Sequence, residues 1–104
     1  MFTIEDARIK CNEKKIKWSQ HQSMRMMQRG ITREDVLRCI DGGEIIEEYP
    51  DHWLNPAALV FGHSVKGRIM HVVIGMDEYI HIITSYFPDE TKFESDMKTR
   101  KEKK

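Results

Sequence analysis

The sequence predicts an α+β fold in which about three N-terminal helices pack on a four-stranded antiparallel meander. Residues 3–42 contain capping residues followed by apolar residues at helical spacing, whereas residues 44–87 contain runs of β-branched and aromatic residues separated by turn residues. Helices that precede the strands, rather than alternating with them, are typical of the α+β class. A chain of 104 residues favours one domain with one modest core.

Three helices are predicted, over residues 3–17, 20–29 and 33–41. Each follows a side chain that can accept a hydrogen bond from the first helical turn, and these capping residues are Thr3, Ser19 and Thr32. Gly30 suits the left-handed conformation at the end of the second helix, and Gly42 with Gly43 stops the third. The chain is therefore predicted to be helical up to the point where its β-rich half begins.

Four strands are predicted, over residues 44–49, 58–65, 68–76 and 79–87. A loop with a proline at each end follows the first strand. Short turns at Lys66-Gly67 and Asp77-Glu78 join the last three strands, which therefore pair with their sequence neighbours in antiparallel fashion. Pro88 ends the last strand, and residues 89–99 form either a short helix or an arm.

The domain is predicted to cover residues 1–97, with residues 98–104 as a disordered basic tail. The chain has 17 basic and 17 acidic residues, and a net charge of zero argues against a protein that coats nucleic acid by charge alone. The distribution is uneven, however. Residues 8–38 hold nine Lys or Arg against three acidic residues, residues 41–51 hold five acidic and no basic residues, and residues 97–104 hold five basic residues against one acidic. The protein can therefore present a basic face.

The two cysteines, Cys11 and Cys39, form no CxxC motif, and no secretory segment precedes them. No apolar run approaches the ~20 residues that a membrane-spanning helix needs. These observations predict a cytoplasmic protein without a membrane partner. The histidines and cysteines lack zinc-ligand spacing and no nucleophile elbow is present, so neither a metal nor a cofactor is predicted.

His21, Arg25 and Arg29 recur every four residues along the second predicted helix. Four residues advance about 40° around a helix, so these side chains form one slanted polar stripe, with Gln28 at its edge. Two guanidiniums beside an imidazole suit the binding of a phosphate while a proton moves. The same spacing also fits a solvated helix face, and the residues alone leave both interpretations open.

The last two predicted strands bring a second group of polar residues together. A two-residue turn between them pairs His71 with Thr84 and Ile69 with Tyr86, so His71, Thr84 and Tyr86 share one sheet face. That face also carries Val73 and Ile82, whereas the opposite face, on which the helices pack, carries Met70, Val72, Ile74 and Ile83. A connection of odd length would break this arrangement, because a one-residue slip turns every side chain to the other face.

Four segments in order, HQSMRMMQRGI, GEIIEEYP, LVFGHSVKGRIMHVVIG and ITSYFPDETKF, resemble a family of small prokaryotic proteins of unknown function. That family distantly resembles the BrnT and RelE-type toxins of toxin–antitoxin pairs, and the match covers residues 18–93. The resemblance implies a RelE/barnase-like fold and a small antitoxin partner of zinc-finger type. The recurrent polar residues of the family fall on His21, Arg25, Arg29, His71 and Thr84, with Tyr86 close behind. An Arg-Pro-Leu-His run of the family corresponds to residues 68–71 here, where the proline is missing.

The residues and the resemblance together predict a metal-independent endoribonuclease of the mRNA interferase type. Such an enzyme needs a base for the 2′-hydroxyl proton, an acid for the leaving oxygen and cations for the phosphorane-like charge. The predicted catalytic residues are His21, His71, Arg25, Arg29, Thr84 and Tyr86. The two histidines would be the acid–base pair, in either order, and the two arginines would hold the phosphate. The hydroxyl side chains would orient the RNA, and the tyrosine could stack on a base.

Arg68, Gln28 and Trp53 are predicted to bind the substrate, although Arg68 beside a hairpin turn also fits a surface cation. The main alternative function is a non-catalytic RNA- or partner-binding module of the same fold, which would grip a phosphate or an acidic partner helix. His71→Gln separates the two functions, since a ribonuclease would lose turnover while RNA binding survives. A third alternative is partner binding without RNA, for which removing Arg25 and Arg29 would leave RNA affinity unchanged.

Overall fold

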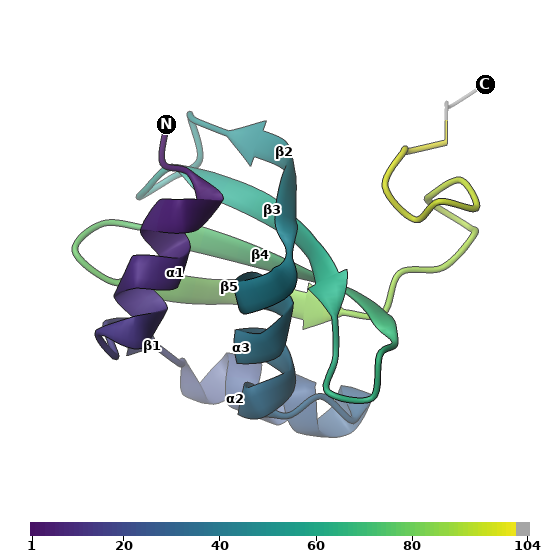
Figure 1. Cartoon of the computed structure of the whole chain (residues 1–104), viewed down its shortest axis with the longest axis horizontal. Coiled ribbons are helices and arrows are strands. Elements are labelled where there is room, and N and C mark those ends of the chain that lie inside the picture. Colours follow the sequence, from purple (N-terminus) through teal and green to yellow (C-terminus); the bar gives the residue numbers. More distant parts are fainter. Residues whose placement is uncertain (102–104) are drawn as a thin grey trace.

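The computed structural model describes residues 1–101. In this part of the chain the first and third helices pack on one face of a five-stranded sheet, and the second helix runs beside its last strand (Figure 1). The helices are α1 (Ile4–Asn12), α2 (Gln20–Arg29) and α3 (Arg33–Gly42). The strands are β1 (Ile16–Lys17), β2 (Glu44–Tyr49), β3 (Ala57–His63), β4 (Ile69–Met76) and β5 (Ile80–Tyr86). The predicted α+β class is confirmed. Residues 102–104 of the predicted basic tail lie outside the described residues.

The sheet is mixed, with strand order β1-β5-β4-β3-β2, and the prediction of a four-stranded antiparallel meander is wrong in this respect. The additional strand arises because α1 ends at Asn12 and does not continue to residue 17. The polar residues after Asn12 offer no apolar face for packing, and Lys14 takes a left-handed backbone conformation (φ 60°) that redirects the chain. β1 then pairs in parallel with β5, where Ile16 lies opposite Ile80.

The hydrophobic core lies between the helices and one face of the sheet. Its buried residues are Ala7, Met26, Ile31, Val36, Cys39, Ile40, Val60, Met70, Val72, Ile74, Ile80 and Ile82. The predicted helix caps are confirmed, because Thr3, Ser19 and Thr32 each accept a hydrogen bond from the backbone N–H three residues later. Gly30 has the predicted left-handed conformation (φ 70°) at the end of α2. Local capping signals therefore determine where these helices begin.

β4 and β5 pair in a register that differs from the predicted one, yet the same polar side chains share a face. Three residues, 77–79, connect the paired ends of the strands, rather than two. This odd connection alone would turn His71 and Thr84 to opposite faces. A β-bulge at Ile83 adds one more residue to β5 and restores the alternation. His71 consequently pairs with Tyr86, and the predicted pairing of His71 with Thr84 is wrong by two residues.

The bulge also exchanges the positions predicted for Ile82 and Ile83. Ile82 lies opposite Ile74 and belongs to the core beneath the helices. Ile83 is half-buried on the other face, where its Cδ1 would lie 3.3 Å from a Cβ added at Gly75. The prediction that Ile83 packs against the helices is therefore wrong, because the bulge turns its side chain away from them.

The face of the sheet that the helices leave free is covered, near the end of β5, by residues 92–101, which we call the strap. Phe93 of the strap is only 1% exposed. A single bridge between Phe93 and Arg100 folds the strap back on itself, so it forms an arm rather than a helix. The sequence predicts that residues 98–101 belong to the disordered tail. In the structure, however, Lys98 and Arg100 form ion pairs with β2. Figure 1 shows the strap in yellow, beyond the end of β5.

Gly62→Ala is expected to lower the free energy of unfolding by roughly 1–3 kcal/mol. Gly62 lies in β3 beneath α3, where an added Cβ would be 2.4 Å from the carbonyl oxygen of Cys39 and 2.8 Å from its Sγ. A backbone oxygen cannot yield unless the helix moves, so the clash separates α3 from the sheet. Urea unfolding would show this as a lower midpoint with an unchanged slope.

Gly42→Ala is the matched control for this substitution. Gly42 is the last residue of α3, and a Cβ added there meets nothing within 4 Å. Alanine favours the helix over glycine, so the midpoint is expected to stay or rise. Equal midpoints for the two variants would contradict the close packing of α3 on β3.

Candidate functional site

His71 lies beneath the strap and has no exposed surface. Its register neighbours are Phe61 on β3 and Tyr86 on β5, so these three side chains share the face that the helices leave free. The ring of Phe93 packs edge-on against the imidazole, with ring centroids 4.7 Å apart. His71 is therefore enclosed in an aromatic cluster formed by three strands and the strap.

Both ring nitrogens of His71 have hydrogen-bond partners. Nε2 lies 2.6 Å from the carbonyl oxygen of Met97, and Nδ1 lies 3.3 Å from the hydroxyl of Tyr86. A carbonyl can only accept, so Nε2 carries the proton, and in the neutral ring Nδ1 accepts from the tyrosine. Burial lowers the pKa of His71, and the hydrogen bond to Met97 opposes this shift without cancelling it. The imidazole is thus neutral near pH 7, and neither nitrogen is free for proton transfer in this conformation.

Ion pairs anchor the strap to β2. Arg100 Nε lies 2.7 Å from the carboxylate of Glu47, and Lys98 Nζ lies 3.2 Å from that of Glu44. Lys98 also lies 4.7 Å above the ring of Phe61. The acidic strip and the basic C-terminal region seen in the sequence are therefore paired with each other in the fold.

Glu47 is a candidate functional residue that the sequence analysis missed. Its carboxylate accepts hydrogen bonds from Arg100 and from the hydroxyl of Tyr49. Burial raises the pKa of Glu47, but these two hydrogen bonds outweigh it and the pKa is lowered overall. The complementary charges of residues 41–51 and 97–104 were the signal that could have placed Glu47 beside the strap.

Arg29 links α2 to the end of β5. Its guanidinium donates to the carbonyl oxygen of Ser85 at 2.6 Å and to Thr84 Oγ1 at 3.3 Å. Arg29 can reach both because it is the last residue of α2, and this end of the helix lies beside β5. The structure therefore brings Arg29 and Thr84 together, and Thr84 lies on the same sheet face as His71 and Tyr86.

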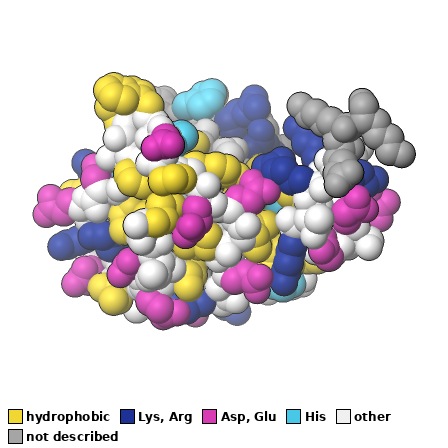
Figure 2. Space-filling model, turned by 90° about the horizontal axis from the view of Figure 1, so that it is seen from above, with side chains coloured by type: hydrophobic (Ala, Val, Ile, Leu, Met, Phe, Trp, Pro, Cys, Tyr) yellow, Lys and Arg dark blue, Asp and Glu magenta, His cyan; other side chains and the backbone are white. Residues whose placement is uncertain are grey.

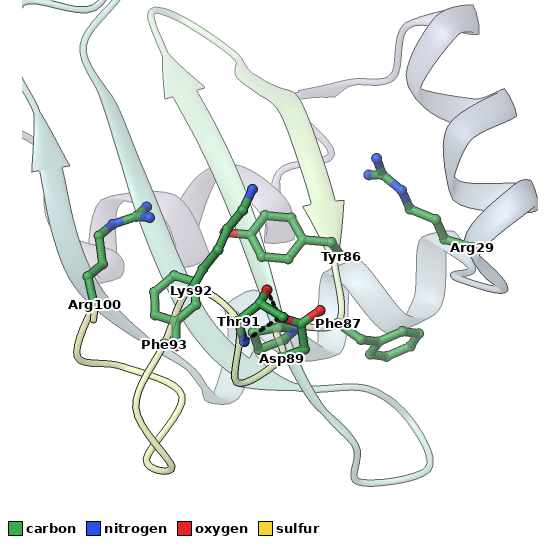
Figure 3. A pocket seen from close by; sticks show the side chains of 9 residues that line it. Arg29, Tyr86, Phe87, Asp89, Thr91, Lys92, Phe93 and Arg100 are labelled. Atoms are coloured by element: carbon green, nitrogen blue, oxygen red, sulfur yellow. Dashed lines mark hydrogen bonds between the residues drawn. The ribbon is translucent and has the colours of Figure 1, made fainter. Parts of the chain in front are cut away.

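A cavity of about 390 Å³ opens next to this contact, between the end of β5 and the strap (Figure 3). It is lined by Arg29, Tyr86, Phe87, Pro88, Asp89, Thr91, Lys92, Phe93 and Arg100. Three of these residues are cations and one is an acid, a balance that suits an anionic ligand. In Figure 3 the side chain of Lys92 extends past the ring of Tyr86. Figure 2 shows basic and acidic side chains interspersed over the face of the molecule seen there.

The other members of the predicted helix stripe, His21, Arg25 and Gln28, are exposed. His21 lies about 12 Å from Arg29 along the helix axis, at about 1.5 Å per residue. His71 is buried beneath the strap, on the sheet face opposite the one that the helices cover. The described structure therefore does not bring His21 and His71 together as an acid–base pair.

Arg68 and Trp53 occupy different surroundings. The guanidinium of Arg68 lies 3.8 Å above the ring of Phe87, which itself lines the cavity. Trp53 lies in the loop between β2 and β3, is 82% exposed, and does not line the cavity. Arg68 therefore borders the candidate site, whereas Trp53 lies apart from it.

Neither a metal site nor a membrane-spanning helix is present among residues 1–101. This part of the chain holds no group of three His, Cys, Asp or Glu side chains arranged to bind a metal ion. Its helices also lack the length and apolar character that crossing a membrane requires.

The fold and the site define a small α+β domain with a cationic cavity beside an enclosed histidine. The chain belongs to a family described as a domain of unknown function, DUF4258, whose model matches residues 18–91. No curated protein and no solved structure matches it. Because the family match ends at residue 91, the whole strap lies beyond the matched domain.

Proposed function

We propose that this protein binds single-stranded RNA and that the cavity at the end of β5 holds backbone phosphates. The observation that carries the proposal is that Arg29, Lys92 and Arg100 border one opening together with a single carboxylate, that of Asp89. Lysine and arginine neutralise phosphates and supply most of the sequence-independent affinity for nucleic acid. An RNA strand is a ligand that can contact all three cations, because its charges repeat along the chain.

Tyr86 and Phe87 border the same cavity and provide aromatic surface. Unpaired bases stack on such side chains with little regard to sequence, at about 1–3 kcal/mol per base. The exposed Arg25 extends the basic surface along α2. Since the net charge of the chain is zero, affinity depends on this local surface and is expected to fall steeply with salt.

A metal-independent endoribonuclease of a toxin–antitoxin pair is the second candidate function. It is favoured because His71, Thr84 and Tyr86 share one sheet face, and Arg29 donates a hydrogen bond to Thr84 at the edge of that face. A RelE/barnase-like fold and an mRNA substrate are part of this candidate. Both nitrogens of His71 are occupied in the described conformation, so phosphate binding has more direct support than cleavage.

A small antitoxin of zinc-finger type is the proposed partner, and the cytoplasm is the proposed compartment. On α2, Met24 and Met27 are 55% and 80% exposed, close to Arg25. Apolar side chains next to a cation suit an acidic amphipathic helix. Such a helix would cover the same arginine as RNA, so the two ligands would exclude each other.

Lys92→Ala is expected to weaken RNA binding roughly three- to tenfold at low ionic strength. The Lys92 side chain is exposed, so the substitution leaves the fold intact while removing one phosphate contact. The slope of log affinity against log salt should fall by about 0.7, the value per phosphate for a single strand. Fluorescence anisotropy of a labelled 2′-O-methyl oligoribonucleotide, which cannot be cleaved through its 2′-oxygen, measures both quantities.

Arg38→Ala is the matched control, since it removes a cation from the exposed surface of α3, away from the cavity. Its affinity and salt slope are expected to equal those of the unchanged protein. Equal losses for Lys92→Ala and Arg38→Ala would indicate unspecific charge attraction and would count against the cavity as the binding site.

A further inference from the structure

Glu47 and His71 project from the same face of the sheet, two strands apart. Glu47 pairs with Leu59 of β3, and His71 pairs with Phe61, two residues further along the same strand. Neighbouring strands lie about 4.8 Å apart and each residue advances about 3.3 Å along a strand. The backbones of the two residues are therefore separated by about 10 Å across the sheet and about 7 Å along it, or about 12 Å in all. A phosphodiester can therefore lie between a carboxylate on one side and an imidazole on the other.

The strap closes the space between these two residues. Arg100 Nε lies 2.7 Å from the carboxylate of Glu47, and the carbonyl oxygen of Met97 lies 2.6 Å from Nε2 of His71. Phe93 packs against the imidazole at the same time. The strap thus makes polar contacts with both the carboxylate of Glu47 and Nε2 of His71.

The polar contacts between the strap and the sheet can open, and their opening also exposes the buried ring of Phe93. Within the described part of the chain, its backbone–backbone hydrogen bonds all close on residues 89–101, so it adds no strand to the sheet. The side chains of Lys98 and Arg100 are 39% and 50% exposed in their ion pairs, so salt screens both. The family match ends at residue 91, so the strap lies beyond the residues that the family model matches.

We propose that Glu47 and His71 are a latent acid–base pair for RNA cleavage and that the strap keeps this pair closed. The inference rests on the proposed RNA binding, and it adds the reacting residues and their regulation. Lys92 and Arg100 move with the strap when it opens, whereas Arg29 stays at the end of β5 as the phosphate-binding cation.

In the closed state Arg100 pairs with the carboxylate of Glu47, the base. The carbonyl oxygen of Met97 accepts the hydrogen bond from Nε2 of His71, the acid. Release of the strap frees both groups at once, and Nε2 becomes the free nitrogen because Tyr86 stays bonded to Nδ1.

The cleavage step needs no co-reactant besides the RNA. The Glu47 carboxylate takes the proton of a 2′-hydroxyl, and the 2′-oxygen forms a bond to the adjacent phosphorus. The bond from phosphorus to the 5′-oxygen breaks. The His71 imidazole, which takes a second proton from water once the open strap no longer buries it, gives its Nε2 proton to that oxygen. The products are a 2′,3′-cyclic phosphate and a 5′-hydroxyl. A second proton exchange with water then restores both side chains.

Met97→Pro opens the strap without changing any charge or any residue of the sheet. Met97 has a φ of 58°, and its N–H donates to the carbonyl oxygen of Glu94 at 2.8 Å. Proline fixes φ near about −65° and has no N–H, so the closed conformation is lost. Met97→Gly is the matched control, because glycine accepts the positive φ and keeps the carbonyl that binds His71.

Cleavage of a 5′-labelled RNA oligonucleotide of mixed sequence is measured with the full chain in excess, so that affinity does not limit the rate. Met97→Pro is expected to cleave roughly 100-fold faster than the unchanged chain and to leave cyclic phosphate ends, whereas Met97→Gly should not. Adding Glu47→Gln or His71→Gln to Met97→Pro should abolish the gain. Affinity for the 2′-O-methyl oligonucleotide, compared within the Met97→Pro background, should stay unchanged.

Arg100→Gln gives a second way to free Glu47 that does not depend on a backbone change, and a smaller rise in cleavage is expected from it. If Met97→Pro loses cooperative melting, Arg100→Gln decides the outcome. The latent pair is overturned if the cleavage rate rises in neither Met97→Pro nor Arg100→Gln. It is also overturned if the faster cleavage remains when Glu47→Gln is added to either variant, even where RNA binding is retained. Failure of the unchanged chain to bind the 2′-O-methyl oligonucleotide would instead overturn the proposed RNA binding.

Discussion

Phe93→Ala is expected to lower the free energy of unfolding by about 3–5 kcal/mol. The ring is 1% exposed and packs on the imidazole of His71 at a centroid distance of 4.7 Å, and the guanidinium of Arg100 lies 4.8 Å from its centroid. Its removal leaves a gap beside a buried histidine and admits water to it. Denaturant unfolding followed by circular dichroism measures the loss, and a smaller slope would show that the strap has already detached in the native state.

Trp53→Ala is the control for Phe93→Ala, because it removes an even larger aromatic side chain that is 82% exposed. Its effect is expected to stay within about 0.5 kcal/mol. A loss at Phe93 no larger than that at Trp53 would show that the strap does not pack on the sheet. That result would also remove the seal on which the latent Glu47–His71 pair depends.

Asp35→Ala is expected to cost about 2–4 kcal/mol, the sum of a lost helix cap and an unsatisfied buried donor. Asp35 Oδ2 accepts a hydrogen bond from the N–H of Thr32 at 2.9 Å and completes the capping box of α3. Oδ1 accepts from the N–H of Val65 at 2.9 Å, in the turn before β4. Because Asp35 is only 9% exposed, water replaces these bonds poorly. One carboxylate therefore joins α3 to the turn that leads into the strand of His71.

The same carboxylate makes part of the stability depend on pH. Burial raises the pKa of Asp35, but the hydrogen bonds from Thr32 and Val65 outweigh burial and the pKa is lowered overall. A carboxyl with a lowered folded-state pKa stabilises the fold above its unfolded pKa of about 3.9 and loses that contribution as the pH falls through the folded value. The difference in unfolding free energy between Asp35→Ala and the unchanged protein should therefore narrow in acid.

Glu34→Ala is the control for Asp35→Ala, since it removes the same charge from the same first turn of α3 at an exposed position. Its loss of unfolding free energy is expected to be about 0.3–1 kcal/mol, the usual contribution of a charge near a helix N-terminus. Equal costs for the two variants would assign the effect to the helix dipole rather than to the two hydrogen bonds of Asp35.

Features that depend on neighbours in sequence were predicted well. The caps at Thr3, Ser19 and Thr32 and the left-handed Gly30 are present, because a cap needs only a side chain and a backbone N–H three residues away. The end of α1 was predicted too far along the chain. Residues 13–17 have no apolar stripe, and whether they continue a helix is decided by the free edge of β5, which offers Ile16 a partner.

The grouping of His71, Thr84 and Tyr86 on one face was predicted, but through a register that is wrong by two residues. The connection between β4 and β5 is one residue longer than predicted, and the bulge at Ile83 adds one further residue to β5. Each change alone would turn the side chains of β5 to the opposite face, and together they cancel. No local signal marks the bulge, because it depends on how β5 packs against β4 and the helices. The shared face of His71, Thr84 and Tyr86 therefore survived because the two shifts cancelled, whereas between the bulge and the connection the predicted faces of Ile82 and Ile83 are exchanged.

The sequence by itself determined the α+β class, the helix starts and the presence of a polar stripe on α2, since these depend on spacing and capping within a few residues. Only the tertiary structure decided that His71 is enclosed, that Arg29 meets Thr84 while His21 remains apart, and that Glu47 pairs with Arg100 of the strap. These arrangements depend on where the strap lies and on charges far apart in the chain, which meet because folding brings the acidic strand β2 and the basic C-terminal residues to the same face.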